Sequence, residues 1–188
     1  DWDIRWRAIH VLGAAKDKRA CDDLIRMLQD ENKYVREAAA IALGEIKDIC
    51  AVGPLIKALQ DENKYVREEV TAALAEIKDK RSMKPLIKAL QDKDWGVRWG
   101  AANALGEVGD QTAIEPLVRA LDDEVRYVRE GASSALARIG KPAVKRTVTR
   151  KVTVTKPSAR KPAVKKPAVK KVAARKPAAR KSMARKTA

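Results

Sequence analysis

The ten residues LQDENKYVRE occupy positions 28–37 and return without change at positions 59–68. The Val-Arg pair inside this stretch recurs at a fixed interval of 31 residues, at positions 35–36, 66–67, 97–98 and 128–129. Ile4-Arg5 is a conservative match one interval earlier. A strict period of about 20 to 50 residues is the signature of stacked supersecondary units. The sequence therefore predicts a solenoid over residues 1–140, with repeats beginning near Ile4, Val35, Val66, Val97 and Val128.

Each repeat predicts a pair of helices. After each Val, apolar residues follow at helical spacing and form one stripe. In the second repeat this stripe comprises Val35, Ala39, Ala42, Leu43 and Ile46. We expect this longer helix to end near Gly44, Gly106 or Gly140, or slightly beyond. A turn with a recurrent Asp then leads to a shorter helix. Its first turn, where a missing N–H costs nothing, contains Pro54, Pro85 and Pro116.

Charge divides the chain into two unlike parts. Of the 41 Lys and Arg residues, 18 lie in residues 141–188, which contain none of the 25 Asp and Glu residues. The repeat region therefore carries a net charge of about −2 and the tail about +18. Five of the eight prolines also lie in this tail, and large apolar residues are scarce there. Because such a segment cannot bury enough apolar surface to offset its ordering entropy, we expect it to be disordered.

The register V-R-x-x-A-A-x-A-L-G-x-I-x-D-x-x-A-V-x-P-L-I-x-A-L-x-D, read over residues 1–140, resembles the short HEAT-like repeats first noted in phycobilisome lyases. The resemblance implies an all-α, right-handed α-solenoid, with the longer helices on the concave side and the shorter ones on the convex side. The arginines that follow each Val recur at the same repeat position, and a row of such residues suggests a phosphate-binding surface. The family instead implies that each Arg reaches the linker Asp of a neighbouring repeat. The arginines are Arg5, Arg36, Arg67, Arg98 and Arg129, and the linker residues are Asp30, Asp61, Asp92 and Asp123.

All four Trp and all three Tyr residues occupy only three of the 31 repeat positions. These positions lie on one helical face, apart from the apolar stripe. Exposed rings among mixed charges are typical of a protein-binding surface. The alternative is that the rings pack against Lys and Arg stems without a partner. The predicted partner-binding residues on the concave face are Trp2, Trp6, Arg7, His10, Tyr34, Glu37, Tyr65, Glu68, Trp95, Trp99, Asn103, Tyr127 and Glu130.

The charges of this face decide which partner it suits. The acidic residues of this face, which include Glu69, are about as numerous as its basic residues. A near-neutral groove is a poor track for phosphates, since duplex affinity is largely counterion release by clustered Lys and Arg. We therefore assign a protein or peptide to the groove, and nucleic acid to the tail.

Basic pairs recur every five residues in the tail, separated by Pro-Ala-Val or Pro-Ala-Ala triplets. These pentads resemble the C-terminal tails of linker histones and of lysine-rich bacterial nucleoid proteins, which implies non-specific nucleic-acid binding. The alternative is a solvated tail that binds acidic protein or membrane surfaces. The predicted nucleic-acid-binding residues are Lys145, Arg146, Arg150, Lys151, Arg160, Lys161, Lys165, Lys166, Lys170, Lys171, Arg175, Lys176, Arg180, Lys181, Arg185 and Lys186.

Two cysteines, Cys21 and Cys50, stand 29 residues apart at different repeat positions. This spacing indicates neither a disulfide framework nor a metal site, so we expect both cysteines to be small buried hydrophobes. We also expect a reducing, cytoplasmic setting, either free or associated with the nucleoid. No apolar run is long enough for a membrane span, and no membrane partner is expected. The chain opens inside a repeat, and we expect further repeats upstream.

Catalytic patterns are weak throughout. His10 is the only histidine, which excludes a His-rich metal site and the several His-Glu pairs implied for a HEAT-repeat hydroxylase of the deoxyhypusine type. Neither a Gly-rich phosphate loop nor a nucleophile elbow occurs. The sequence thus predicts a monomeric, non-enzymatic scaffold without cofactor or metal, tethered to nucleic acid by its tail. The alternatives are a nucleoid-associated, non-specific DNA-binding protein, and an enzyme of the HEAT-like DNA glycosylase or bilin-lyase type.

Overall fold

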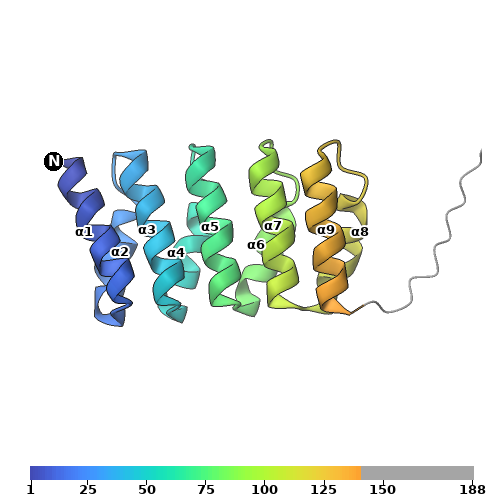
Figure 1. Cartoon of the computed structure of the whole chain (residues 1–188), viewed down its shortest axis with the longest axis horizontal. Helices are drawn as coiled ribbons and strands as arrows, with labels where there is room; N and C mark the ends of the chain where they lie inside the picture. Colours follow the sequence, from blue (N-terminus) through green and yellow to red (C-terminus); the bar gives the residue numbers. More distant parts are fainter. Residues whose placement is uncertain (141–188) are drawn as a thin grey trace, which may run out of the picture. The chain divides into compact units, whose positions relative to one another are not determined.

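The computed structural model describes residues 1–140, which are entirely helical apart from turns. The predictions made for residues 141–188, disorder and nucleic-acid binding, lie outside the described residues. Five helices of 14 residues alternate with four helices of seven residues (Figure 1). The long helices are α1 (Trp2–Ala15), α3 (Lys33–Ile46), α5 (Lys64–Ile77), α7 (Trp95–Val108) and α9 (Arg126–Ile139). The short helices are α2 (Cys21–Met27), α4 (Val52–Ala58), α6 (Met83–Ala89) and α8 (Ile114–Ala120).

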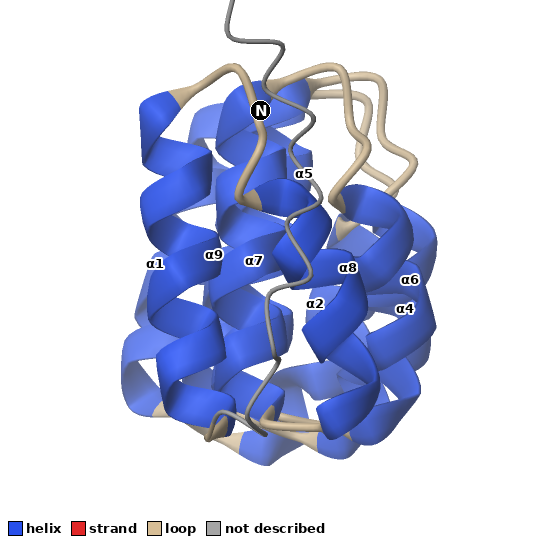
Figure 2. Cartoon of the chain, turned by 90° about the vertical axis from the view of Figure 1, so that its right-hand side faces the viewer, coloured by secondary structure: helices blue, strands red, loops and turns tan. Residues whose placement is uncertain are grey.

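The helices of the repeat region form two layers. The long helices stand on one side and the short helices on the other, as the end-on view in Figure 2 shows. Each long helix up to α7 packs against the next long helix, and α3, α5, α7 and α9 each also pack against the short helix that precedes them. This is the all-α solenoid of helix pairs that the 31-residue period predicts.

Local sequence sets the ends of these helices. The side chains of Asn32, Asn63 and Asp94 accept hydrogen bonds from backbone N–H groups in the first turns of α3, α5 and α7. The turns before the short helices are capped in the same way, by the recurrent Asp. One short 3-10 turn precedes each short helix, at Lys18–Ala20, Ile49–Ala51, Lys80–Ser82 and Gln111–Ala113.

The long helices extend two residues beyond Gly44 and Gly106, so these glycines are not caps. The left-handed residue that ends each helix is Lys47 after α3 and Gly109 after α7. Gly44 instead allows close packing, because a Cβ there would lie 2.9 Å from the Cα of Ala73. Gly106 faces Ala135 in the same way, at 2.7 Å. The stacking of adjacent long helices therefore depends on small residues.

The apolar stripe is the core, as predicted. Val35, Ala39 and Leu43 have no exposed surface. Ile4 is an exception at 66% exposure, although it matches Val35 in the repeat. Among the described helices, α1 has a long-helix neighbour only on its α3 side, so its other side is not covered. All fully buried apolar residues of the described chain lie between residues 9 and 135, and a chain ending at residue 140 keeps them all.

The arginine column links each repeat to the next. The guanidinium of Arg36 bonds both carboxylate oxygens of Asp61 in the loop before α5, at 2.7 and 3.0 Å, and also donates to the carbonyl of Asp30 in the loop before its own helix α3. The ion pairs Arg5–Asp30, Arg67–Asp92 and Arg98–Asp123 follow the same pattern, at 2.7 to 2.8 Å. The structural role implied for these arginines is thereby confirmed.

We expect Arg67→Met to lower the free energy of unfolding by about 3 kcal/mol or more, because it leaves the Asp92 carboxylate half-buried without its partner. Arg129→Met is the matched control, since within residues 1–140 Arg129 donates only to the carbonyls of Asp123 and Glu124. We expect it to cost about 1 to 2 kcal/mol. Urea unfolding followed by circular dichroism measures both values, and equal losses would contradict the inter-repeat role.

Acid should weaken the same contact. Hydrogen bonds from the Arg98 guanidinium lower the pKa of Asp123 below its usual value, and this outweighs the opposing effect of burial. A lowered folded-state pKa stabilises the protein above the unfolded pKa of about 3.9, and this contribution is lost as the pH falls through the folded value. We expect Asp123→Asn to be less stable than the parent at neutral pH, with the difference shrinking below about pH 4. Thermal unfolding across pH checks this, with the exposed Asp122→Asn as control.

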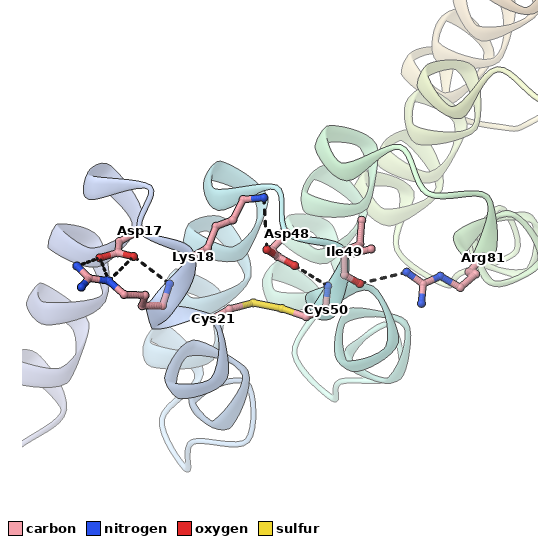
Figure 3. Close-up of a disulfide and its surroundings, with 8 residues drawn as sticks. Asp17, Lys18, Cys21, Asp48, Ile49, Cys50 and Arg81 are labelled. Atoms are coloured by element: carbon pink, nitrogen blue, oxygen red, sulfur yellow. Dashed lines mark hydrogen bonds and ion pairs between the residues drawn. A yellow bond between two sulfur atoms is a disulfide. The ribbon is translucent and has the colours of Figure 1, made fainter.

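The two cysteines form a disulfide, Cys21–Cys50, which corrects the expectation of two unpaired hydrophobes (Figure 3). Cys21 is buried at the start of α2, whereas Cys50 is exposed in the turn before α4. Stacking brings α2 against that turn, so a separation two residues short of the repeat still places the side chains together. Because disulfides are typical of oxidising compartments, the cysteines no longer support a reducing setting.

Candidate functional site

Seven aromatic side chains follow the layer of long helices from α1 to α9. Each of them is between 38% and 60% exposed, whereas the core is filled by aliphatic side chains. We call this set the aromatic ridge. It comprises Trp2, Trp6, Tyr34, Tyr65, Trp95, Trp99 and Tyr127. The structure thus places on the surface of one helix layer the rings that the sequence assigned to one face.

Two ring pairs on the ridge have nearly the same geometry. The Trp2 and Tyr34 centroids are 5.7 Å apart at an angle of 33°, and those of Trp95 and Tyr127 are 5.7 Å apart at 30°. Both tryptophans belong to the pattern Trp-x-x-Arg-Trp, which occurs at residues 2–6 and 95–99. Each pair joins one long helix to the next, so the constant register of the solenoid sets its geometry.

The other predicted residues lie among these rings. His10 is exposed and packs edge-on against Trp6, with centroids 4.3 Å apart. Ion pairs join Arg7 to Asp3 at 3.0 Å and Glu130 to Arg126 at 2.7 Å. Glu37 and Asn103 are half-buried.

Lysines cover two of the tyrosines. The ammonium of Lys33 lies 4.9 Å from the centre of the Tyr34 ring, and that of Lys64 lies 5.0 Å from the centre of Tyr65. The interpretation that rings pack against basic side chains therefore holds for these two tyrosines. It shows that the ridge already accommodates a cation over an aromatic face.

A pocket of about 340 Å³ opens where α5, α7 and α9 meet. Its aromatic walls are Trp95, Trp99 and Tyr127, and α5 contributes Glu68 and Glu69. Sequence reasoning did not single out the glycines that make this space, Gly96 and Gly100. The available signal was the tyrosine column at positions 34, 65 and 127, which Gly96 interrupts.

The acidic side of the pocket is partly shielded from water. Burial raises the pKa of Glu68, and a hydrogen bond shared with the Asp94 carboxyl adds to the rise. Burial also raises the pKa of Glu69, assisted by the charge of Glu37. Lys64 pairs with Asp94 at 3.1 Å. The carboxyl groups of Glu68 and Glu69 therefore lie beside the aromatic walls, and a cation bound there would favour their charged forms.

One cluster of metal-type ligands occurs within residues 1–140. Atoms of Cys21, Asp48 and Cys50 lie within 4.8 Å of one another. The two sulfurs are joined to each other, and the Asp48 carboxylate accepts the N–H of Cys50 and pairs with Lys18. This arrangement offers no free thiolate to an ion. None of the described helices is both long and apolar enough to span a bilayer.

The family of HEAT repeats matches residues 1–53 and 52–137. The chain belongs to this family. No curated protein matches it in sequence. Because the family match ends at residue 137, the likeness of the tail to linker-histone tails stays a prediction.

Solved structures with the same fold have varied roles. The CpcE–CpcF complex of phycocyanin lyase from Nostoc sp. PCC7120 is similar at 28% identity and a TM-score of 0.68, over 74% of this chain and 60% of that chain. This chain therefore spans less than two thirds of that relative's length. Human deoxyhypusine hydroxylase matches at 27% identity and a TM-score of 0.58, over 65% and 44%. A designed armadillo repeat protein in complex with the peptide (KR)4 matches at 20% identity and 0.51, over 62% of each chain.

The Trp95–Tyr127 contact gives a direct prediction for this site. We expect Tyr127→Ala to raise the exposure of the Trp95 indole and to cost about 0.5 to 1.5 kcal/mol of stability beyond the lost area burial. Tyr65→Ala is the control, since no ring contacts Tyr65 among the aromatic pairs of residues 1–140. Acrylamide quenching of tryptophan fluorescence checks the difference, and equal quenching in the two variants would contradict it.

Proposed function

We propose that this protein is a non-enzymatic scaffold whose aromatic ridge binds a peptide or protein partner and whose basic tail tethers it to nucleic acid. The observation that carries the first part is the line of seven exposed rings across five stacked helices. Trp and Tyr are enriched among the residues that dominate the energy of protein interfaces. Their alignment suits an extended partner, which could meet successive repeats in turn.

The structural relatives support the peptide-binding part at the level of fold. The designed armadillo protein similar to this chain is in complex with (KR)4, and a second was designed for modular peptide recognition. Stacked long helices can therefore present a peptide-binding surface. The residues that would bind the partner in this chain come from its own ridge.

The tether rests on the sequence of the tail alone. Eighteen positive charges without an acidic residue attract phosphates, and basic pairs at intervals of five suit an irregular polyanion. A tether to nucleic acid implies a cytoplasmic location at the nucleoid, whereas the Cys21–Cys50 disulfide is typical of an oxidising compartment. Fractionation of the cells that make the protein distinguishes the two.

The second candidate is a bilin-lyase-type role, favoured by the similarity to the CpcE–CpcF complex. In that case the ridge would hold a tetrapyrrole, and added phycocyanobilin would gain absorbance and quench the tryptophans. Phycocyanobilin binding that is lost in Trp99→Ala would favour this candidate over the scaffold.

The ridge is tested with the chain ending at residue 140 as bait. We expect Tyr34→Ala combined with Tyr65→Ala to weaken capture of its partner by about tenfold or more, since interface Tyr residues are frequent hot spots. Val118→Ala, a partly exposed apolar residue on α8 in the other layer, is the control and should leave capture unchanged. Equal effects of the two variants would exclude the ridge as the binding surface.

The tail is tested by titrating duplex DNA with the full chain and with the chain ending at 140. If eight tail charges meet phosphates, the log–log salt slope of the full chain should be about −7. The shortened chain should lose measurable affinity. Retained affinity at near-physiological salt would instead favour the alternative of a nucleoid-associated protein that binds DNA through its repeats.

A further inference from the structure

The pocket between α5, α7 and α9 is lined by two glycines of the fourth repeat, Gly96 and Gly100. Gly96 replaces the tyrosine found at the same position of three other repeats. A Cβ at Gly96 would collide with the Glu68 carboxylate, and one at Gly100 would collide with the Thr71 hydroxyl. Gly96 therefore leaves space where every other repeat carries a side chain, whereas Gly100 shares its position with Gly131 and replaces side chains of the first three repeats. The two lining glycines give the pocket access to a carboxylate on α5.

Three rings from two helices enclose that space. Trp95 and Trp99 lie on successive turns of α7, and Tyr127 of α9 stacks at an angle against Trp95. Gly131 allows the Trp99 ring to lie against α9, since a Cβ there would be 3.0 Å from its Cδ1 atom. Indole and phenol faces attract cations through their negative quadrupole.

The charges beside these rings are mostly negative. Glu68 and Glu69 line the pocket, and Asp94 adjoins Glu68. The basic neighbour, Lys64, is already paired with Asp94, and Arg126 on α9 is paired with Glu130. The helix face as a whole is near neutral, but this part of it is acidic. Aromatic walls with a partly buried acidic side are the combination that favours an alkyl chain ending in a positive charge.

We propose that this pocket binds the side chain of a lysine or arginine in an extended, positively charged peptide segment of a partner protein. The alkyl stem would lie against Trp95 and Trp99, with its charged group toward Glu68. A volume of about 340 Å³ is at the small end of ligand pockets, which suits one long side chain better than a cofactor. This inference rests on the proposed function, because it names the chemistry of the ridge's partner.

The test uses two-dimensional NMR of the indole N–H signals in the chain ending at 140, which removes the tail's own lysines and arginines as competitors. Trp→Phe variants assign the four signals. The probes are the peptides (Lys-Ala)4, (norleucine-Ala)4 and (Glu-Ala)4, which differ in charge but share length and backbone. We expect (Lys-Ala)4 to shift the signals of Trp95 and Trp99 more than those of Trp2 and Trp6. The norleucine peptide should bind about tenfold more weakly or worse, a difference of about 1.4 kcal/mol.

Two variants locate the effect. Glu68→Gln should weaken (Lys-Ala)4 binding several-fold, whereas Glu115→Gln, the same change at an exposed residue of α8 in the other layer, should not. Gly96→Tyr restores the residue of the other repeats and fills the pocket, so it should abolish the Trp99 shift while the fold is kept. Unchanged circular dichroism confirms that the variants are folded.

Several results would overturn the proposal. These are equal binding of the lysine and norleucine peptides, equal effects of Glu68→Gln and Glu115→Gln, and no shift of Trp95 or Trp99 up to about 5 mM peptide. Stronger shifts with a single-stranded oligonucleotide than with (Lys-Ala)4 would also overturn it, in favour of base stacking. Any of these results can occur while Tyr34 and Tyr65 still support partner capture. The experiments therefore distinguish failure of this pocket proposal from failure of the proposed function.

Discussion

The buried arginine–aspartate bridge is the constraint on which the rest of the repeat region depends. Arg67 is only 4% exposed, and it bonds the loop before its own helix as well as Asp92 in the loop before the next long helix, α7. A buried guanidinium without these partners would cost several kcal/mol, of the order of 3 to 5. A slip between adjacent repeats would leave both charges unpaired. Each bridge therefore fixes the offset of one helix pair relative to the next.

A constant offset has two consequences for the surface. Residues at equal repeat positions fall in rows along the long helices, which is why Trp2 meets Tyr34 just as Trp95 meets Tyr127. The offset also brings the long helices so close that Ala73 faces a glycine. An interface built from alanine and glycine has no room for rings. The aromatic residues are consequently outside the core, where a partner could reach them.

The structural features that recur in every repeat are predicted well from the sequence. The stripe through Val35 and the short helices were readable because several copies carry the same pattern, and the resemblance to HEAT-like repeats implied the aspartate partners of the arginines. Prediction fails where one copy differs or where a residue has two uses. Gly44 predicts the end of its helix to within two residues, but its own role is close packing, and the cap is Lys47. Cys21 and Cys50 lie two residues out of register, and only the stacked structure brings them together.

The pocket shows why departures from the repeat are informative about function. The first and fourth repeats share the Trp-x-x-Arg-Trp pattern, yet they use the intervening positions differently. Asp3 and Arg7 occupy the positions of Gly96 and Gly100, and there they form an ion pair with N···O at 3.0 Å. In the fourth repeat both side chains are missing, and Glu68 from the preceding helix faces the space. The same pair of tryptophans thus flanks an ion pair in one place and lines an open, acidic pocket in the other. The difference is carried by glycines, whose contribution is the absence of a side chain.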